Sequence, residues 1–437
     1  MPGADLREAV HTLQGTESDY QPLLDRIGDA RFVLLGEGSH GTHEFYQHRA
    51  EITKRLITEK GFSAVAVEAD WPDAYRVNRY VRGEGEDRNA DDALSGFQRF
   101  PTWMWRNTVV LDFVEWLRDE NSSRASSSKA GFFGLDLYSL FNSMKTVIEY
   151  LEKVDPEAAK RARYRYSCFE HFAEDSQAYG YAASFDLSRS CEDEAVNQLV
   201  ELERQAIEYL SRTGGDDFFD AEQNARLVRN AEEYYRSMFR GRQSSWNLRD
   251  THMAETVEAL VSHYTRHGRE PKLVVWAHNS HLGDARATEM GKRGELNVGQ
   301  LIRQQHGDDA VLVGFTTYAG TVTAARDWDD PGLRRRVRPA LANSYELGFH
   351  ETGLPCFFLD LRRAAGQSTL MSKSRLERAI GVVYRPDTER VSHYFLADMP
   401  RQFDAIFHFD QTRALEPLEE LESWHDIEPP ETFPSGI

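Results

Sequence analysis

The hydrophobic pattern of the chain predicts a series of short buried strands. Each candidate is a continuous apolar run that stops abruptly at a glycine or a polar cluster, as buried strands do. The candidate runs lie at residues 32–35, 62–67, 131–137, 273–277, 310–315, 355–359, 380–384 and 405–409. Because nearly all of these runs are continuous and not alternating, they indicate parallel strands that are covered on both faces.

Between the third and fourth runs, the apolar spacing changes to that of helices. Met144, Val147 and Leu151 recur every three to four positions, and this spacing continues to about residue 270. No long heptad repeat occurs there, so we expect helices packed over the sheet and not a coiled coil. The uneven strand spacing favours an open sheet over a barrel. The predicted class is therefore α/β, with a mostly parallel central sheet, flanking helices and a large, lid-like helical insertion.

This pattern divides the chain into three segments. Residues 1–140 and 271–437 are expected to form two parts of one α/β catalytic domain, and residues 141–270 a helical insertion or lid. A parallel sheet already has crossover helices on its faces, so an insertion of this length exceeds what the sheet requires. We expect it to roof the strand ends and to make a deep cleft there.

Composition and charge narrow the range of partners. The 437 residues are 40% hydrophobic and carry a formal net charge of -19, which argues against nucleic acid or an anionic membrane as the main partner. The first residues lack the basic start and apolar core expected of a secretory leader, and no apolar run of about 18 residues occurs. Cys168, Cys191 and Cys356 are odd in number and widely spaced, which favours reduced thiols. We expect a soluble, cytoplasmic protein that acts on a small molecule, with its oligomeric state left open.

Polar residues gather where predicted strands end. Glu37 and His40 lie in the glycine-rich turn 36–41 after the first strand, Glu68 ends the second, and His278 and His281 follow the strand at 273–277. The turn formally matches a dinucleotide-binding fingerprint, but the Glu37 carboxylate would repel a pyrophosphate. Because the carboxyl ends of parallel strands meet at one edge of a sheet, we expect these five side chains to form one catalytic site.

This set of side chains is compatible with two kinds of chemistry. Histidine and carboxylate ligands suit Zn²⁺ or Mn²⁺, and the same groups perform metal-free acid–base catalysis. The sequence does not separate these two possibilities. In the metal-free case, a neutral histidine held by a carboxylate activates water, and a second histidine or an arginine stabilises the developing oxyanion.

A further group of residues is predicted to bind the substrate. The group comprises His43, Arg76, Trp105, Tyr235, Trp246 and Arg249. Arg76 lies one helical turn past the Glu68 strand end, and Arg249 lies in the motif that opens a long helix. The alternative for each arginine is a surface or interhelical ion pair, and for the aromatic residues a place in the core.

Five ordered motifs carry a resemblance to a known family. They are the turn at 36–41 with Glu44-Phe45, Val67-Glu68-Ala69-Asp70-Trp71, residues 100–107 (Phe-Pro-Thr-Trp-Met-Trp-Arg-Asn), Asn247-Leu248-Arg249-Asp250 with Met253-Ala254, and Ala277-His278-Asn279-Ser280-His281. Together they resemble the erythromycin esterase family. The resemblance implies an α/β hydrolytic fold with a helical covering region, and cofactor-free, metal-independent opening of a macrolide lactone by water. The catalytic histidine and glutamate of the family's turn correspond to His40 and Glu37, and its downstream histidines to His278 and His281.

From these observations we predict a carboxylic ester hydrolase of the erythromycin esterase type. It would open a macrolide lactone or a related ester with water activated by a histidine base, and would serve in antibiotic resistance. The alternatives are a nucleotide-, haem- or metal-binding α/β protein, or a hydrolase of an unrelated ester.

Overall fold

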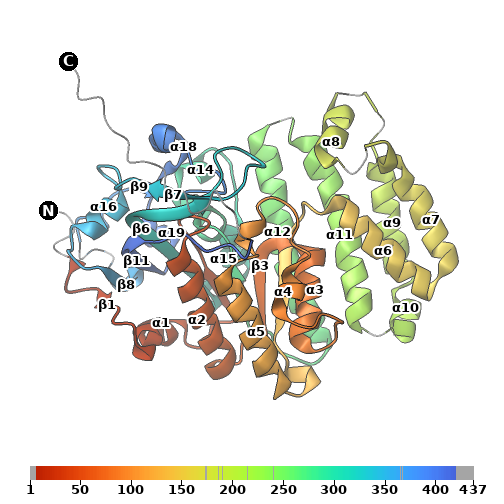
Figure 1. Cartoon of the computed structure of the whole chain (residues 1–437), viewed down its shortest axis with the longest axis horizontal. Helices are drawn as coiled ribbons and strands as arrows, with labels where there is room; N and C mark the ends of the chain where they lie inside the picture. The colour runs from red at the N-terminus through yellow and green to blue at the C-terminus, as the bar shows by residue number, and fades with distance from the viewer. Residues whose placement is uncertain are drawn as a thin grey trace.

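The computed structural model of the chain describes residues 6–172, 175–185, 187–188, 190–213, 215–239, 241–364, 366 and 368–419. Figure 1 shows an α/β body that surrounds a central sheet, with a group of helices, α6 to α11, gathered on one side of it. Among the described residues, no helix is both long and apolar enough to cross a membrane.

The central sheet has nine strands and is open. Its order is β1-β8-β11-β6-β2-β5-β3-β4, with β7 paired to β6. The six strands from β11 to β4 are mutually parallel, and β1, β7 and β8 pair in antiparallel fashion. The strands are β1 (His11–Thr12), β2 (Phe32–Leu35), β3 (Ala64–Asp70), β4 (Gly131–Asp136), β5 (Leu273–Trp276), β6 (Ala310–Ala324), β7 (Leu333–Val337), β8 (Cys356–Asp360) and β11 (Ala405–Thr412). The predicted open, mostly parallel α/β sheet is confirmed.

Both faces of this sheet are buried, which explains the continuous apolar runs. In β2, Phe32 and Leu34 belong to one hydrophobic core, while Val33 and Leu35 belong to the other. All four side chains are fully buried. Burying each of them stabilises the fold by about 1.5–3 kcal/mol, so neither face of the strand tolerates a polar residue.

Several helices of the α/β body cover these two faces, and the others lie around its edge and loops. The helices of the body are α1 (Gln21–Ile27), α2 (His43–Glu59), α3 (Trp71–Arg82), α4 (Ala90–Leu94), α5 (Thr108–Ser122), α13 (Asn279–Leu282), α14 (Glu289–Lys292), α15 (Val298–His306), α16 (Tyr345–His350), α17 (Leu361–Ala364), α18 (Glu389–Ser392) and α19 (Met399–Gln402). Helices α1, α2 and α5 pack on the face of Val33 and Leu35, and α15 and α16 on the opposite face. Asn107 caps α5 by accepting a hydrogen bond from the backbone of Val110 at 2.9 Å.

The predicted helical insertion is present. Its helices are α6 (Leu140–Val154), α7 (Pro156–Tyr166), α8 (Ser176–Ser184), α9 (Glu192–Arg204), α10 (Ala206–Thr213), α11 (Gly215–Ser237) and α12 (Arg242–Arg266). Helix α11 packs against α6, α8, α9 and α12, and α12 returns the chain to the body, where it contacts β4 and α15. The apolar faces of these helices continue the hydrophobic core that contains Phe32 and Leu34.

Two expectations are wrong. Residues 380–384 are not a strand; β9 (Arg375–Arg378) and β10 (Tyr394–Ala397) form a separate antiparallel pair instead. Ile380 bonds to the glycine-rich turn, because its N–H donates to Gly38 at 3.0 Å and its carbonyl accepts from His40 at 2.9 Å. The prediction of three reduced thiols also fails, since Cys168 and Cys191 form a disulfide. The folded insertion brings their Cα atoms to 6.0 Å, although 23 residues separate them in sequence.

Candidate active site

The glycine-rich turn between β2 and α2 holds Glu37 and His40 against neighbouring backbone. A Cβ atom on Gly36 would overlap the side-chain oxygen of Asn279, and Gly41 adopts a φ of +69°. The N–H of Asn279 donates to the Glu37 carbonyl at 2.8 Å, so the turn is bonded to the start of α13. The glycines of the turn are therefore explained by tight packing inside the protein.

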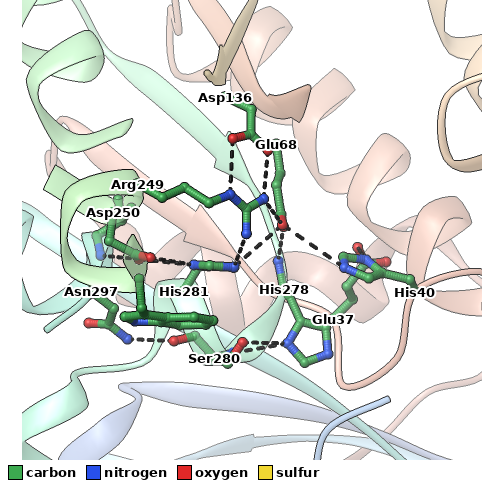
Figure 2. A network of polar contacts seen from close by, with 12 residues as sticks. Glu37, His40, Glu68, Asp136, Arg249, Asp250, His278, Ser280, His281 and Asn297 are labelled. Carbon is green, nitrogen blue, oxygen red and sulfur yellow. Dashed lines mark hydrogen bonds and ion pairs between the residues drawn. The ribbon is translucent and has the colours of Figure 1, made fainter. Parts of the chain in front are cut away.

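The parallel sheet and one long helix bring the remaining polar residues to this turn. Glu68 lies near the carboxyl end of β3, and His278 and His281 follow β5 directly. Arg249 and Asp250 come from α12 of the insertion. Figure 2 shows His40 and His281 on opposite sides of the Glu68 carboxylate, with Arg249 across one flank.

His40 is held by a buried ion pair behind it. Its Nδ1 lies 2.8 Å from Glu37 Oε1, and Arg49 Nη2 donates to the other oxygen, Oε2, at 3.0 Å. Arg49 is fully buried and its guanidinium only donates, and the Glu37 carboxylate accepts at both oxygens in these contacts. His40 Nδ1 therefore carries the proton, and Nε2 keeps a lone pair that faces Glu68 Oε1 at 4.0 Å.

His281 is held in a similar way from the other side. Its Nδ1 lies 2.9 and 3.0 Å from the two oxygens of Asp250, and Trp246 stacks on its ring at 4.5 Å. Nε2 lies 3.4 Å from Glu68 Oε1 and 3.0 Å from Arg249 Nη1. Burial alone would lower the pKa of His281, but the charges of Asp250 and Glu68 outweigh it and raise that pKa above its usual value.

Glu68 and Arg249 form the charged centre of the site. Arg249 Nη2 donates to Glu68 Oε1 at 2.8 Å and to Asp136 Oδ2 at 2.6 Å, and the N–H of His278 donates to Glu68 Oε2 at 2.8 Å. Burial would raise the pKa of Glu68, but the neighbouring charges of His281 and Arg249 lower it well below its usual range. Glu68 is therefore ionised at neutral pH.

His278 differs from the other two histidines. Its Nδ1 lies 2.8 Å from the Ser280 hydroxyl and accepts from the Ser280 N–H at 3.2 Å, and its ring lies 4.9 Å from that of His40. Burial, together with the neighbouring charge of His40, keeps the pKa of His278 well below its usual value. Because it stays neutral and caps α13, His278 is suited to positioning the other groups.

These side chains open onto a cavity of about 990 Å³. His40, Glu68, His278 and His281 line it, and Glu37 supports His40 from behind. A second cavity of about 1080 Å³ adjoins it. The wall residues common to both cavities are Arg99, Phe100, Tyr138 and Trp328. Helices α8 and α11 of the insertion contribute lining residues to the second cavity.

The residues predicted to bind substrate separate into two groups. Trp105, Trp246 and Arg249 line the first cavity, and Tyr235 lines the second. His43 and Arg76 line neither cavity. His43 Nε2 contacts Arg413 at 2.6 Å, and Arg76 forms an ion pair with Asp87 at 2.6 Å.

Several residues of the site were absent from the sequence prediction. They are Arg49, Arg99, Asp136, Tyr138, Asp250 and Trp328. Two had a usable signal, because Asp136 ends a predicted strand and Asp250 follows Arg249 directly. Arg49 had none: it is one of two arginines in α2, and only the fold shows that it points inward.

The charged side chains at the centre of the site are already bonded to one another. The guanidinium of Arg249 lies between the carboxylates of Glu68 and Asp136 and supplies the positive charge there. Within the described ranges, one set of histidine and carboxylate side chains has three possible metal-donor atoms within 4.8 Å of one another. The residues of this set do not line the cavity.

The fold is α/β, and the site gathers histidine, carboxylate and arginine side chains at the carboxyl edge of its parallel strands. The chain belongs to the erythromycin esterase family, whose sequence model matches residues 57–412. That range contains Glu68, Arg249, Asp250, His278 and His281, while the turn that carries His40 precedes it.

Individual relatives agree with this assignment. An erythromycin esterase type II of Escherichia coli is 26% identical over 319 residues, which cover 70% of this chain and 73% of that protein. A putative hydrolase, YbfO, of Bacillus subtilis is 21% identical over 351 residues, 76% of this chain and 74% of that protein.

Solved structures share the fold. A succinoglycan biosynthesis protein superposes with a TM-score of 0.77 at 21% identity, over 94% of this chain and 97% of that chain. A mutant of the erythromycin esterase EreC in its open conformation gives a TM-score of 0.68 at 18% identity, over 92% and 95% of the two chains.

Proposed function

We propose that this protein is a carboxylic ester hydrolase that opens a macrolide lactone, or a related bulky ester, with water activated by His40. One observation carries the proposal. The Arg49–Glu37 ion pair fixes the proton of His40 on Nδ1, so a basic Nε2 faces the cavity opposite a histidine whose pKa is raised.

The position of the attacking water follows from the gap between His40 and Glu68. His40 Nε2 and Glu68 Oε1 are 4.0 Å apart, which is too far for a direct hydrogen bond. A water molecule at about 2.8 Å from both atoms fits this gap. His40 then takes one proton as the water oxygen bonds to the carbonyl carbon, and the Glu68 carboxylate orients the other proton.

The opposite side of the site suits the negative charge that develops. Arg249 Nη1 donates to His281 Nε2 at 3.0 Å, and the guanidinium borders the cavity, where a positively charged donor stabilises an oxyanion strongly. Collapse of the tetrahedral intermediate breaks the carbon–oxygen bond of the ester. The leaving oxygen takes the proton from the imidazolium of His40. One water is consumed, and a carboxylate and an alcohol are formed.

The size and lining of the cavities support a large substrate. The two adjoining cavities, of about 990 and 1080 Å³, each reach or exceed the upper range of ordinary small-molecule sites. Phe97, Phe100 and Trp105 supply apolar walls. Burial, with the nearby charge of Asp70, raises the pKa of Asp73 to about 7, so a cationic substrate group would ionise this carboxyl fully. A macrolide that carries an amino sugar has these features, and its hydrolysis would confer antibiotic resistance.

A His40→Ala variant tests the proposal. Native protein freed of metal by exhaustive chelation should convert erythromycin to a product heavier by one water, and His40→Ala should lose this activity while it stays folded. His350→Ala is the matched control, because His350 also bonds a carboxylate, Asp410 at 2.6 Å, but lies outside both cavities. Full activity of His40→Ala, or loss of native activity on chelation, would overturn the mechanism.

A further inference from the structure

A second cluster of histidine and carboxylate groups lies outside the active-site cavity. Asp216 is in the first turn of α11, His263 is in the last turn of α12, and His267 is the C-cap residue of α12. One donor atom from each of the three lies within 4.8 Å of the other two. His263 and His267 are four residues apart, so their side chains lie on the same face of the helix.

The hydrogen bonds of His267 leave one ring nitrogen available. Its Nδ1 lies 2.8 Å from the carbonyl oxygen of His263. Because a carbonyl only accepts hydrogen bonds, Nδ1 carries the proton and Nε2 keeps its lone pair. Histidines that bind metals are oriented in this way, with the second nitrogen donating to a carbonyl or a carboxylate.

His263 and Asp216 form one edge of the cluster. His263 Nε2 lies 3.0 Å from Asp216 Oδ1, and the His263 ring stacks on Phe219 at 4.0 Å, which fixes its orientation. Zinc bonds of about 2.0–2.2 Å in a tetrahedron place donor atoms about 3.4 Å apart, so this edge is close to the separation a metal needs. The Asp216 side chain is 48% exposed, which gives an ion access from solvent.

One competing cation is present. Arg82 Nη2 lies 3.4 Å from Asp216 Oδ2, the carboxylate oxygen that faces away from His263. Arg82 also forms an ion pair with Glu84 at 3.1 Å. A metal bound to Asp216 Oδ1 would therefore leave Arg82 its ion pair with Glu84.

We propose that Asp216, His263 and His267 bind a divalent transition metal of the zinc class, with water in the remaining position. Two imidazole nitrogens and one carboxylate oxygen are a suitable ligand set for such an ion. The site closes the end of the α11–α12 hairpin that is opposite its connecting loop.

The proposal is tested by metal titration of the full chain. Chelated protein titrated with Zn²⁺ should bind one ion per chain with a rise in Tm, and Co²⁺ should give the visible absorption of a low-coordinate site. His267→Ala should weaken Zn²⁺ binding by about tenfold or more, and His350→Ala should bind Zn²⁺ as the native chain does. Asp216→Asn, at a half-exposed side chain, gives a second variant if His267→Ala fails to fold.

Three results would overturn this site. They are the absence of saturable Zn²⁺ binding by the native chain, unchanged binding by His267→Ala, and a loss in His350→Ala equal to that in His267→Ala. The measurement needs no substrate, so its outcome is independent of the proposed hydrolase activity.

Discussion

Replacing Glu37 by glutamine should remove the catalytic base while leaving His40 in place. The buried Arg49 donates to one oxygen of this carboxylate, and His40 Nδ1 donates to the other. A glutamine amide has a single oxygen, and the permanently charged guanidinium must face it. The amide NH₂ then faces His40 and forces Nδ1 to accept a hydrogen bond, so the ring proton moves to Nε2, where the lone pair is needed.

The expected magnitude follows from the role of the base. General-base catalysis contributes about 10²–10⁴-fold to a rate, so kcat should fall by about 10²–10⁴ in Glu37→Gln. The KM should change little, since position 37 does not line the cavity. Arg49 also loses its ionic partner, and the buried hydrogen bonds that weaken should lower the free energy of unfolding by about 1–3 kcal/mol.

The assay is steady-state hydrolysis of a small activated ester and of erythromycin, together with urea unfolding to verify the native state. Glu44→Gln is the matched control: it removes a nearby carboxylate in the first turn of α2, one that accepts from the Arg413 backbone at 2.9 Å outside the cavity. If folded Glu37→Gln retained a kcat close to that of the native enzyme, the assignment of the His40 tautomer would be wrong.

Two further predictions concern the opposite side of the site and the substrate channel. Asp250→Asn should lower the pKa of His281 and shift the alkaline limb of the kcat/KM profile to lower pH. Because the folded pKa of His281 is raised, the contribution of His281 to the stability of the fold is complete below its unfolded pKa of about 6.5 and is lost as pH rises through the folded pKa. Urea unfolding of the native chain across this pH range should show that loss of stability. Asp250→Asn should not show it. Trp328→Ala removes a 54% exposed ring that lines both cavities, and should raise KM for erythromycin by about three- to tenfold with no change for a small ester. Equal effects on both substrates would show that this ring does not contact the larger one.

The architecture could be predicted because both faces of the sheet are covered. Runs such as Phe32–Leu35 are apolar at every position for this reason, and they were located to within a few residues. The run at 380–384 was misleading because a buried segment bonded to a glycine-rich turn has the same composition as a strand. An apolar run indicates that a segment is buried, but it does not indicate which backbone groups the segment will bond to.

The gathering of the site residues could be predicted in part. Glu68, His278 and His281 follow strand ends, and parallel strands bring such ends to one edge. The groups that set their protonation could not be found in this way. Arg49 comes from the middle of α2, and Asp250 reaches His281 only because α12 folds back onto the sheet.

The most direct test of the central claim is hydrolysis of erythromycin in water enriched in heavy oxygen, followed by mass spectrometry. If His40 directs water onto the ester carbonyl, native enzyme should give a ring-opened product with one heavy oxygen, located in the new carboxylate. His40→Ala should give none of this product. Label in the alcohol, unchanged erythromycin with the native enzyme, or a labelled product from His40→Ala at the native rate would contradict the account.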